Sequence, residues 1–126
     1  MNWNAIGAVL LALAVVLGAF GAHGLRDRLD PYSMALWEKA VLYHFIHAMG
    51  MLVVSMLPRT QTFPMPAASN VCWLLLAGIL IFCGSLYLLA VTGARTLGMI
   101  TPIGGLAWIV AWLLLAYYFV AQRAAL

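Results

Sequence analysis

The chain has 126 residues, of which 67% are hydrophobic and only 7% are Asp, Glu, Lys or Arg. A soluble domain contains roughly 25% charged residues, so this composition excludes an ordinary water-soluble fold. The net charge of +3 comes from six basic and three acidic side chains, which are too few and too scattered for a nucleic-acid surface. We therefore predict a membrane protein with no nucleic-acid partner.

Uncharged runs occupy residues 1–25, 40–58, 60–94 and 96–122. Each is long enough for a transmembrane helix, which needs about 20 predominantly apolar residues. The sequence predicts an all-α fold, an antiparallel four-helix transmembrane bundle built from two helical hairpins, in one integral membrane domain over residues 1–126. The expected spans are residues 5–22, 35–57, 70–92 and 102–122.

Local residue types predict where the first helices begin and end. Gly24 suits the C-terminus of the first helix. Asp30 followed by Pro31 is typical of an N-cap and a first helical position, so the second helix should start before the membrane. Residues 59–69, with Pro58, Pro64 and Pro66 as helix breakers, predict the loop between the hairpins.

The start of the fourth helix has two interpretations. Thr101 before Pro102 repeats the pattern of an N-cap followed by proline. The alternative is a longer helix that begins near Thr96 and kinks at Pro102, because neighbouring helices can satisfy the backbone groups that a proline leaves free.

Small residues recur every four positions in the first and fourth spans. Ala14, Gly18 and Ala22 form one such row, and Ala107 and Ala111 form another. Rows of this kind let membrane helices approach closely, although Ala and Gly are common enough here for chance matches. We expect close helix packing at these positions, with chance as the alternative.

Four spans place both termini and the middle loop on one side of the membrane and both hairpin turns on the other. Cytoplasmic loops carry an excess of Lys and Arg, so counting basic residues predicts cytoplasmic hairpin turns and external termini. The hairpin-turn side carries Arg26, Arg28, Lys39 and Arg95, and the opposite side carries Arg59 and Arg123.

Polar side chains gather toward the hairpin-turn side. His44 and His47 are three residues apart in the second span, so they share a helix face, and His47 should lie within the hydrocarbon layer. An unpaired imidazole is costly in lipid, which should turn this face inward. The expected polar pocket in one leaflet comprises His23, Glu38, Tyr43, His44, His47, Ser85, Tyr87, Arg95 and Thr101.

Four strings carry a family resemblance across almost the whole chain: GAFGAHGL at residues 18–25, WEKAVLYHFIHA at 37–48, GSLYLLAVTG at 84–93 and TPIGGLAWI at 101–109. They resemble the small four-span family of unknown function that includes the bacterial inner-membrane protein YgdD. The resemblance implies a multi-pass protein of the bacterial inner membrane and supplies no catalytic residues.

Three functions fit such a pocket. The first is binding or packing, in which the polar groups join helices or bind a lipid or a partner, either a second copy or another membrane protein. The second is a redox role with haem, a metal or a quinone, for which His23 opposite His44 is the pairing at compatible depth. The third is ion or proton transport by an oligomer through His44, His47 and Glu38.

The sequence favours the first of these functions. Histidines three apart on one helix cannot clasp both faces of a porphyrin, and no polar path crosses both leaflets of one protomer. Hydrolysis is disfavoured because Ser85 lies in no recognisable triad motif. We expect a small accessory or lipid- or partner-binding protein, not an enzyme, with no cofactor or metal.

Overall fold

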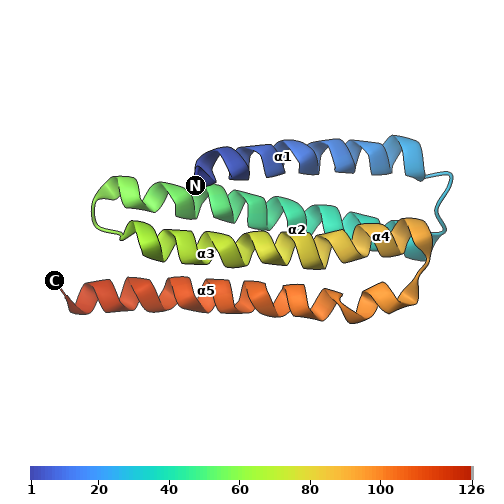
Figure 1. Cartoon of the computed structure of the whole chain (residues 1–126). Coiled ribbons are helices and arrows are strands. Elements are labelled where there is room, and N and C mark those ends of the chain that lie inside the picture. Colours follow the sequence, from blue (N-terminus) through green and yellow to red (C-terminus); the bar gives the residue numbers. More distant parts are fainter. Residues whose placement is uncertain (126) are drawn as a thin grey trace.

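The computed structural model describes residues 1–125, and these contain helices and no strand (Figure 1). Four helical segments are long and apolar enough to cross a membrane, which confirms the predicted fold class. Helix α1, Trp3–Phe20, continues through a π turn at Gly21–Leu25, and α2, Pro31–Met56, continues through a 3₁₀ turn at Leu57–Thr60. Helices α3, Met65–Gly78, and α4, Gly84–Thr92, are joined by a π turn at Ile79–Cys83, and a 3₁₀ turn at Arg95–Met99 precedes α5, Thr101–Ala124.

The helical segments extend beyond the expected spans. They cover Trp3–Leu25, Pro31–Thr60, Met65–Thr92 and Arg95–Ala124. A helix need not end where the hydrocarbon ends, because its backbone hydrogen bonds are internal and its caps can lie in the interface. The boundaries at which the membrane meets each helix therefore stay a prediction.

Both hairpin turns lie at one end of the molecule. In Figure 1 the connection from α1 to α2 and the connection from α4 to α5 lie at the right, whereas the N-terminus, the α2–α3 loop and the C-terminal end of α5 lie at the left. The four strings that carry the family resemblance, at residues 18–25, 37–48, 84–93 and 101–109, thus lie toward this right-hand end.

The helices are arranged in an open layer in the order α1, α2, α3–α4, α5 (Figure 1). Helix α1 packs chiefly on α2, and α5 packs on α3 and the π turn that follows it, while the described parts of α1 and α5 have no substantial contact. In the most apolar stretch of each segment, 17% of residues are buried in the two outer segments, against 39% and 44% in the two middle ones. The outer helices therefore offer most of their surface to lipid.

The N-terminus of α2 forms as predicted, whereas two other predicted helix ends are wrong. The Asp30 carboxylate accepts a 2.7 Å hydrogen bond from the Ser33 backbone N–H, with Pro31 at the first helical position. The first segment does not stop at Gly24 but runs through the π turn to Leu25. Thr101 is not an N-cap, since its hydroxyl is turned inward to Ser85 and Ile100 occupies the cap position.

The closest approaches of one helix backbone to another occur at glycines outside the expected small-residue rows. A Cβ at Gly7 would lie 3.2 Å from the Leu52 backbone nitrogen of α2, and one at Gly104 would overlap the Phe82 backbone. Ala14 and Ala111 of the expected rows are fully buried. In the first row, a Cβ at Gly18 would lie 3.3 Å from the Val41 side chain of α2, whereas Ala22 is exposed.

Candidate functional site

His44 pairs with Tyr87 between α2 and α4. Its Nδ1 lies 3.0 Å from the Tyr87 hydroxyl oxygen, and the His44 side chain is only 2% exposed. The backbone of Leu10 on α1 approaches the same ring, but Nε2 forms no hydrogen bond of ordinary length and angle within the described residues. The imidazole thus sits at the junction of three helices with one nitrogen paired and the other enclosed.

His47 is held through both ring nitrogens. Nδ1 lies 2.8 Å from the Tyr43 backbone carbonyl oxygen, and the Trp112 indole N–H points at Nε2 across 3.2 Å. A carbonyl can only accept and an indole N–H can only donate. His47 must therefore be neutral in this arrangement, with its proton on Nδ1 and the Nε2 lone pair engaged by α5.

Aromatic rings surround His47. Its ring stacks on Trp108 of α5 with 3.6 Å between ring centroids and 6° between planes. Tyr43 lies nearly parallel to Trp108 at 5.8 Å, and Phe82 contacts Trp108 at 4.6 Å. The imidazole is thus one member of an aromatic cluster that joins α2, the Ile79–Cys83 π turn and α5.

A third polar contact joins α4 to α5. The Ser85 and Thr101 hydroxyl oxygens are 2.6 Å apart, and Ser85 also donates to the Phe82 carbonyl at 2.9 Å. The Thr101 hydroxyl also lies 3.4 Å from the Leu97 carbonyl oxygen, to which it can donate, so either hydroxyl can be the donor between Ser85 and Thr101. Both side chains are buried, so this contact fixes the first turn of α5 against α4.

The nine expected site residues do not gather in one pocket. His23, Glu38 and Arg95 are exposed, and the buried histidines face different neighbours, His44 toward α4 and His47 toward α5. Three residues along a helix turn the side chain by about 60°, which is enough to separate the two rings. The expected set therefore divides into the His44–Tyr87 pair, the Tyr43–His47 cluster and the Ser85–Thr101 pair, with the remaining three on the surface.

Tryptophan indoles link the helices at several places, a role that the sequence analysis missed. Trp37 of α2 donates to the Leu17 carbonyl of α1 at 2.9 Å, and Trp108 of α5 donates to the Leu75 carbonyl of α3 at 3.1 Å. Each of these two carbonyls also accepts from the backbone N–H four residues later, Gly21 for Leu17 and Ile79 for Leu75, and that N–H is shared with the next carbonyl along the chain. A π turn begins at each of these two N–H groups. A glycine accompanies each indole, Gly21 under Trp37 and Gly78 under Trp108. A glycine just before or within a π-turn segment and a tryptophan on another span are the signals that could have indicated these contacts.

An apolar groove runs along the surface between α2 and α5. Its volume is about 620 Å³, within the range of roughly 300–1,000 Å³ of small-molecule sites. Pro102 lies in the first turn of α5, and Trp112 lies ten residues further, so the groove extends roughly 15 Å along the helix. This length is about half of the hydrocarbon thickness of a bilayer. The lining residues are Tyr43, His47, Phe82, Pro102, Gly105, Leu106, Trp108, Ile109 and Trp112.

A smaller groove of about 280 Å³ lies between α1 and α2. One of its lining residues, Glu38, is charged, and the other lining side chains are small, aliphatic or aromatic. Glu38 and Lys39 are adjacent and so point about 100° apart; only Glu38 of the two lines this groove. The complete lining is Gly18, Ala22, Met34, Trp37, Glu38, Val41, Leu42 and Phe45.

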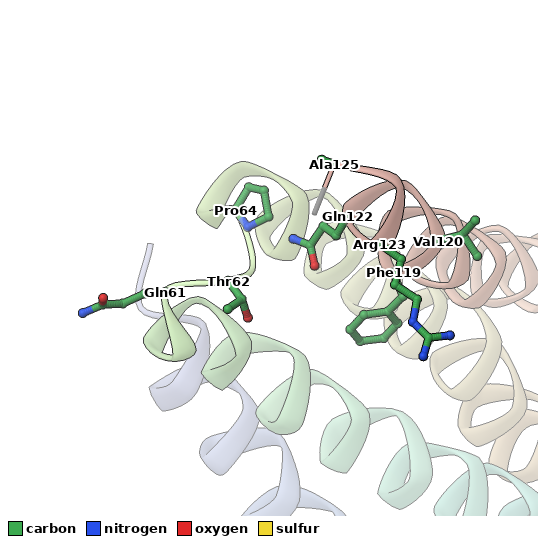
Figure 2. Close-up of a pocket in the computed structure, with 8 residues that line it drawn as sticks. All are labelled: Gln61, Thr62, Pro64, Phe119, Val120, Gln122, Arg123 and Ala125. Atoms are coloured by element: carbon green, nitrogen blue, oxygen red, sulfur yellow. The ribbon is translucent and has the colours of Figure 1, made fainter.

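A third hollow, of about 810 Å³, lies at the opposite end of the molecule. Figure 2 shows it between the α2–α3 loop, which contributes Gln61, Thr62 and Pro64, and the end of α5, which contributes Phe119 and Arg123. Its residues belong to none of the four strings that pointed to a site. We therefore place the candidate site at the hairpin-turn half of the molecule.

The described residues contain no group of three His, Cys, Asp or Glu side chains arranged to hold a metal ion. The expected facing pair of His23 and His44 is not formed either, since His23 is exposed while His44 is buried against Tyr87. The Nε2 lone pair of His47 is already occupied by Trp112.

Four spanning segments, internally paired imidazoles and surface grooves between helices define a small polytopic membrane protein. The chain belongs to the family described as "Protein of unknown function (DUF423)", which matches residues 17–105. This confirms the expected class, a small membrane-protein family of unknown function. The narrower likeness to YgdD is not tested by the relatives below and stays a prediction.

Bacterial relatives cover most of the chain. A "UPF0382 membrane protein" of Staphylococcus epidermidis is 47% identical over 110 residues, which cover 87% of this chain and 88% of the relative. The "UPF0382 membrane protein YwdK" of Bacillus subtilis is 43% identical over 87% of this chain and 89% of its own length. No solved structure matches the chain. The relatives are named only as membrane proteins, and these names assign no role to the grooves or to the paired histidines.

Proposed function

We propose that this chain is a small accessory protein of the bacterial inner membrane that binds a phospholipid hydrocarbon chain in the α2–α5 groove. The groove between Tyr43, Trp108 and Trp112 carries this proposal, because it is lined almost wholly by apolar side chains. It lies on segments that hydrocarbon would surround. Its length of about one leaflet fits one acyl chain.

Dispersion contacts, not the hydrophobic effect, would hold the lipid's hydrocarbon chain in the groove. A lipid tail that moves from the bilayer into the groove leaves an equally apolar medium, so the gain comes from close contact with rigid aromatic faces. Trp108 and His47 are fixed by their hydrogen bonds and by stacking, and the groove wall therefore loses little conformational entropy when a chain binds.

Groove filling tests the proposal. A Cβ at Gly105 would lie 3.7 Å from the Phe82 ring, an ordinary contact, so Gly105→Leu should place its side chain in the groove without disturbing the backbone. Gly84→Leu is the matched control, because a Cβ at Gly84 meets nothing within 4 Å and Gly84 is not a lining residue.

The measurement is native mass spectrometry of each protein after transfer from brominated phosphatidylcholine vesicles into detergent, with quenching of indole fluorescence by the bromine as a second readout. Retained lipid should fall about tenfold in Gly105→Leu, a loss of about 1.4 kcal/mol, and stay unchanged in Gly84→Leu. No retained lipid in the wild type, or equal retention in Gly105→Leu, would reject the proposal. A retained quinone or haem after purification from cells would instead favour a redox role.

The proposed orientation has cytoplasmic hairpin turns and external termini. The support is the excess of Arg26, Arg28, Lys39 and Arg95 at the hairpin-turn end over Arg59 and Arg123 at the other end. A reporter that is fluorescent only in the cytoplasm should be dark when fused to the C-terminus. Fluorescence from that fusion would reverse the orientation and leave the lipid proposal unaffected.

A further inference from the structure

A second site lies on the other side of α2, in the groove between α1 and α2. Glu38 lines this groove and is exposed. An uncharged stretch begins two residues after Glu38 and covers residues 40–58. Because this stretch would lie in the hydrocarbon, the Glu38 carboxylate lies at the boundary between the headgroups and the hydrocarbon. A negative charge at this depth favours a cationic partner.

The groove continues from Glu38 into the apolar layer. Glu38, Leu42 and Phe45 occupy positions i, i+4 and i+7 of α2, so they follow one face of the helix. Phe45 lies roughly 10 Å deeper than Glu38. Gly18 of α1 and Ala22 of the π turn that follows α1 also line the groove, and their small size leaves space that a larger residue would fill.

We propose that this groove binds a phospholipid whose headgroup carries a primary ammonium. The ammonium pairs with the Glu38 carboxylate, and an acyl chain lies along Gly18, Leu42 and Phe45. An anionic headgroup without an amine is repelled at the same position, since like charges at a few ångströms destabilise each other even near a surface. The groove is separate from the α2–α5 groove, and the proposal does not depend on that site.

The test is competitive lipid binding in nanodiscs that contain equal amounts of phosphatidylethanolamine, phosphatidylcholine and phosphatidylglycerol. Native mass spectrometry counts which lipid stays with the protein on release. The wild type should retain phosphatidylethanolamine preferentially. Glu38→Gln should lower its ratio to phosphatidylglycerol about threefold, the effect of one partly exposed ion pair.

Two controls make the result specific. Asp27→Asn removes the same charge at the same end of the molecule but outside the groove, and it should leave the ratio unchanged. Gly105→Leu should not lower the ratio, because it blocks only the α2–α5 groove, which does not select between headgroups, and this separates the two sites.

Three outcomes would overturn the proposal. These are no preference in the wild type, an equal fall of the ratio in Glu38→Gln and Asp27→Asn, and equal retention of phosphatidylcholine and phosphatidylethanolamine. The last would mean that an N–H donor is not used, because the choline headgroup is cationic but has no N–H.

Discussion

Trp112 of α5 donates its indole proton to Nε2 of His47 on α2, across 3.2 Å. The two helices have no extensive backbone contact, so this bond and the stacking of His47 on Trp108 join them through side chains. The same contacts form the floor of the α2–α5 groove. The His47 imidazole, which the sequence offered as a candidate metal ligand, is thus hydrogen-bonded within the protein and forms part of the groove lining.

The coupling between His47 and Trp112 can be measured by a double-mutant cycle. His47→Phe and Trp112→Phe each remove the hydrogen bond and keep an aromatic ring. Reversible unfolding in mixed micelles should give a coupling of about 0.6 kcal/mol, the average for hydrogen bonds between membrane helices. Strict additivity of the two substitutions would contradict the bond.

His47→Leu should lower stability more than Arg123→Gln, since Arg123 is exposed.

Tyr87→Phe should destabilise the protein through His44. The substitution removes the hydroxyl bonded to His44 Nδ1 and leaves a buried ring with both nitrogens unpaired. An unsatisfied buried polar group costs about 1–3 kcal/mol, which thermal unfolding in detergent would detect. Tyr117→Phe is the control, because Tyr117 is 65% exposed. Equal melting temperatures of the two variants would argue against the His44–Tyr87 pair.

Gly78 and Gly84 should respond in opposite directions to alanine. A Cβ at Gly78 would overlap the Trp108 indole, whereas one at Gly84 meets nothing within 4 Å. Gly78→Ala should cost about 1–3 kcal/mol from overpacking, and Gly84→Ala should stabilise by about 0.4–1 kcal/mol through the unfolded state. A midpoint that does not fall in Gly78→Ala would show that the indole does not pack on Gly78.

The start of α2 should weaken in acid. Hydrogen bonds from Ser33 hold the pKa of the Asp30 carboxyl below its ordinary value of 3.8. A carboxyl whose pKa is lower in the folded state stabilises the protein above the unfolded value and loses this contribution as pH falls through the folded value. The melting temperature of the wild type should therefore fall more between about pH 5 and pH 3 than that of Asp30→Asn, which caps without titrating. Parallel pH profiles would mean that ionisation of Asp30 adds nothing to the stability of the cap.

The sequence predicted the features that depend on local chemistry. Asp30 and Pro31 begin α2 because a cap needs only its own side chain and the next turn. The burial of His44 and His47 followed from the cost of an unpaired imidazole in lipid. Their partners did not follow, because the sequence gives no measure of which way Tyr87 and Trp112 turn.

The glycine contacts show the same limit. Ala14, Gly18 and Ala22 have the regular spacing that suggested an interface, yet Gly7 and Gly104 make the closest backbone approaches. Spacing identifies a row on one helix, whereas a close approach also depends on what the neighbouring helix presents. Neither Leu52 nor the π turn at Phe82 has a distinctive pattern in the sequence.

The sequence by itself determined that the protein belongs in a lipid bilayer, and it determined the four helices and their order along the chain, since about twenty consecutive apolar residues suffice to define a span. Only the tertiary structure decided the open layer, the division of the polar residues and the grooves on either side of α2. The physical reason is that helices that are apolar on all sides carry no hydrophobic face to fix their rotation. In lipid that rotation is set by side-chain packing and by hydrogen bonds between helices.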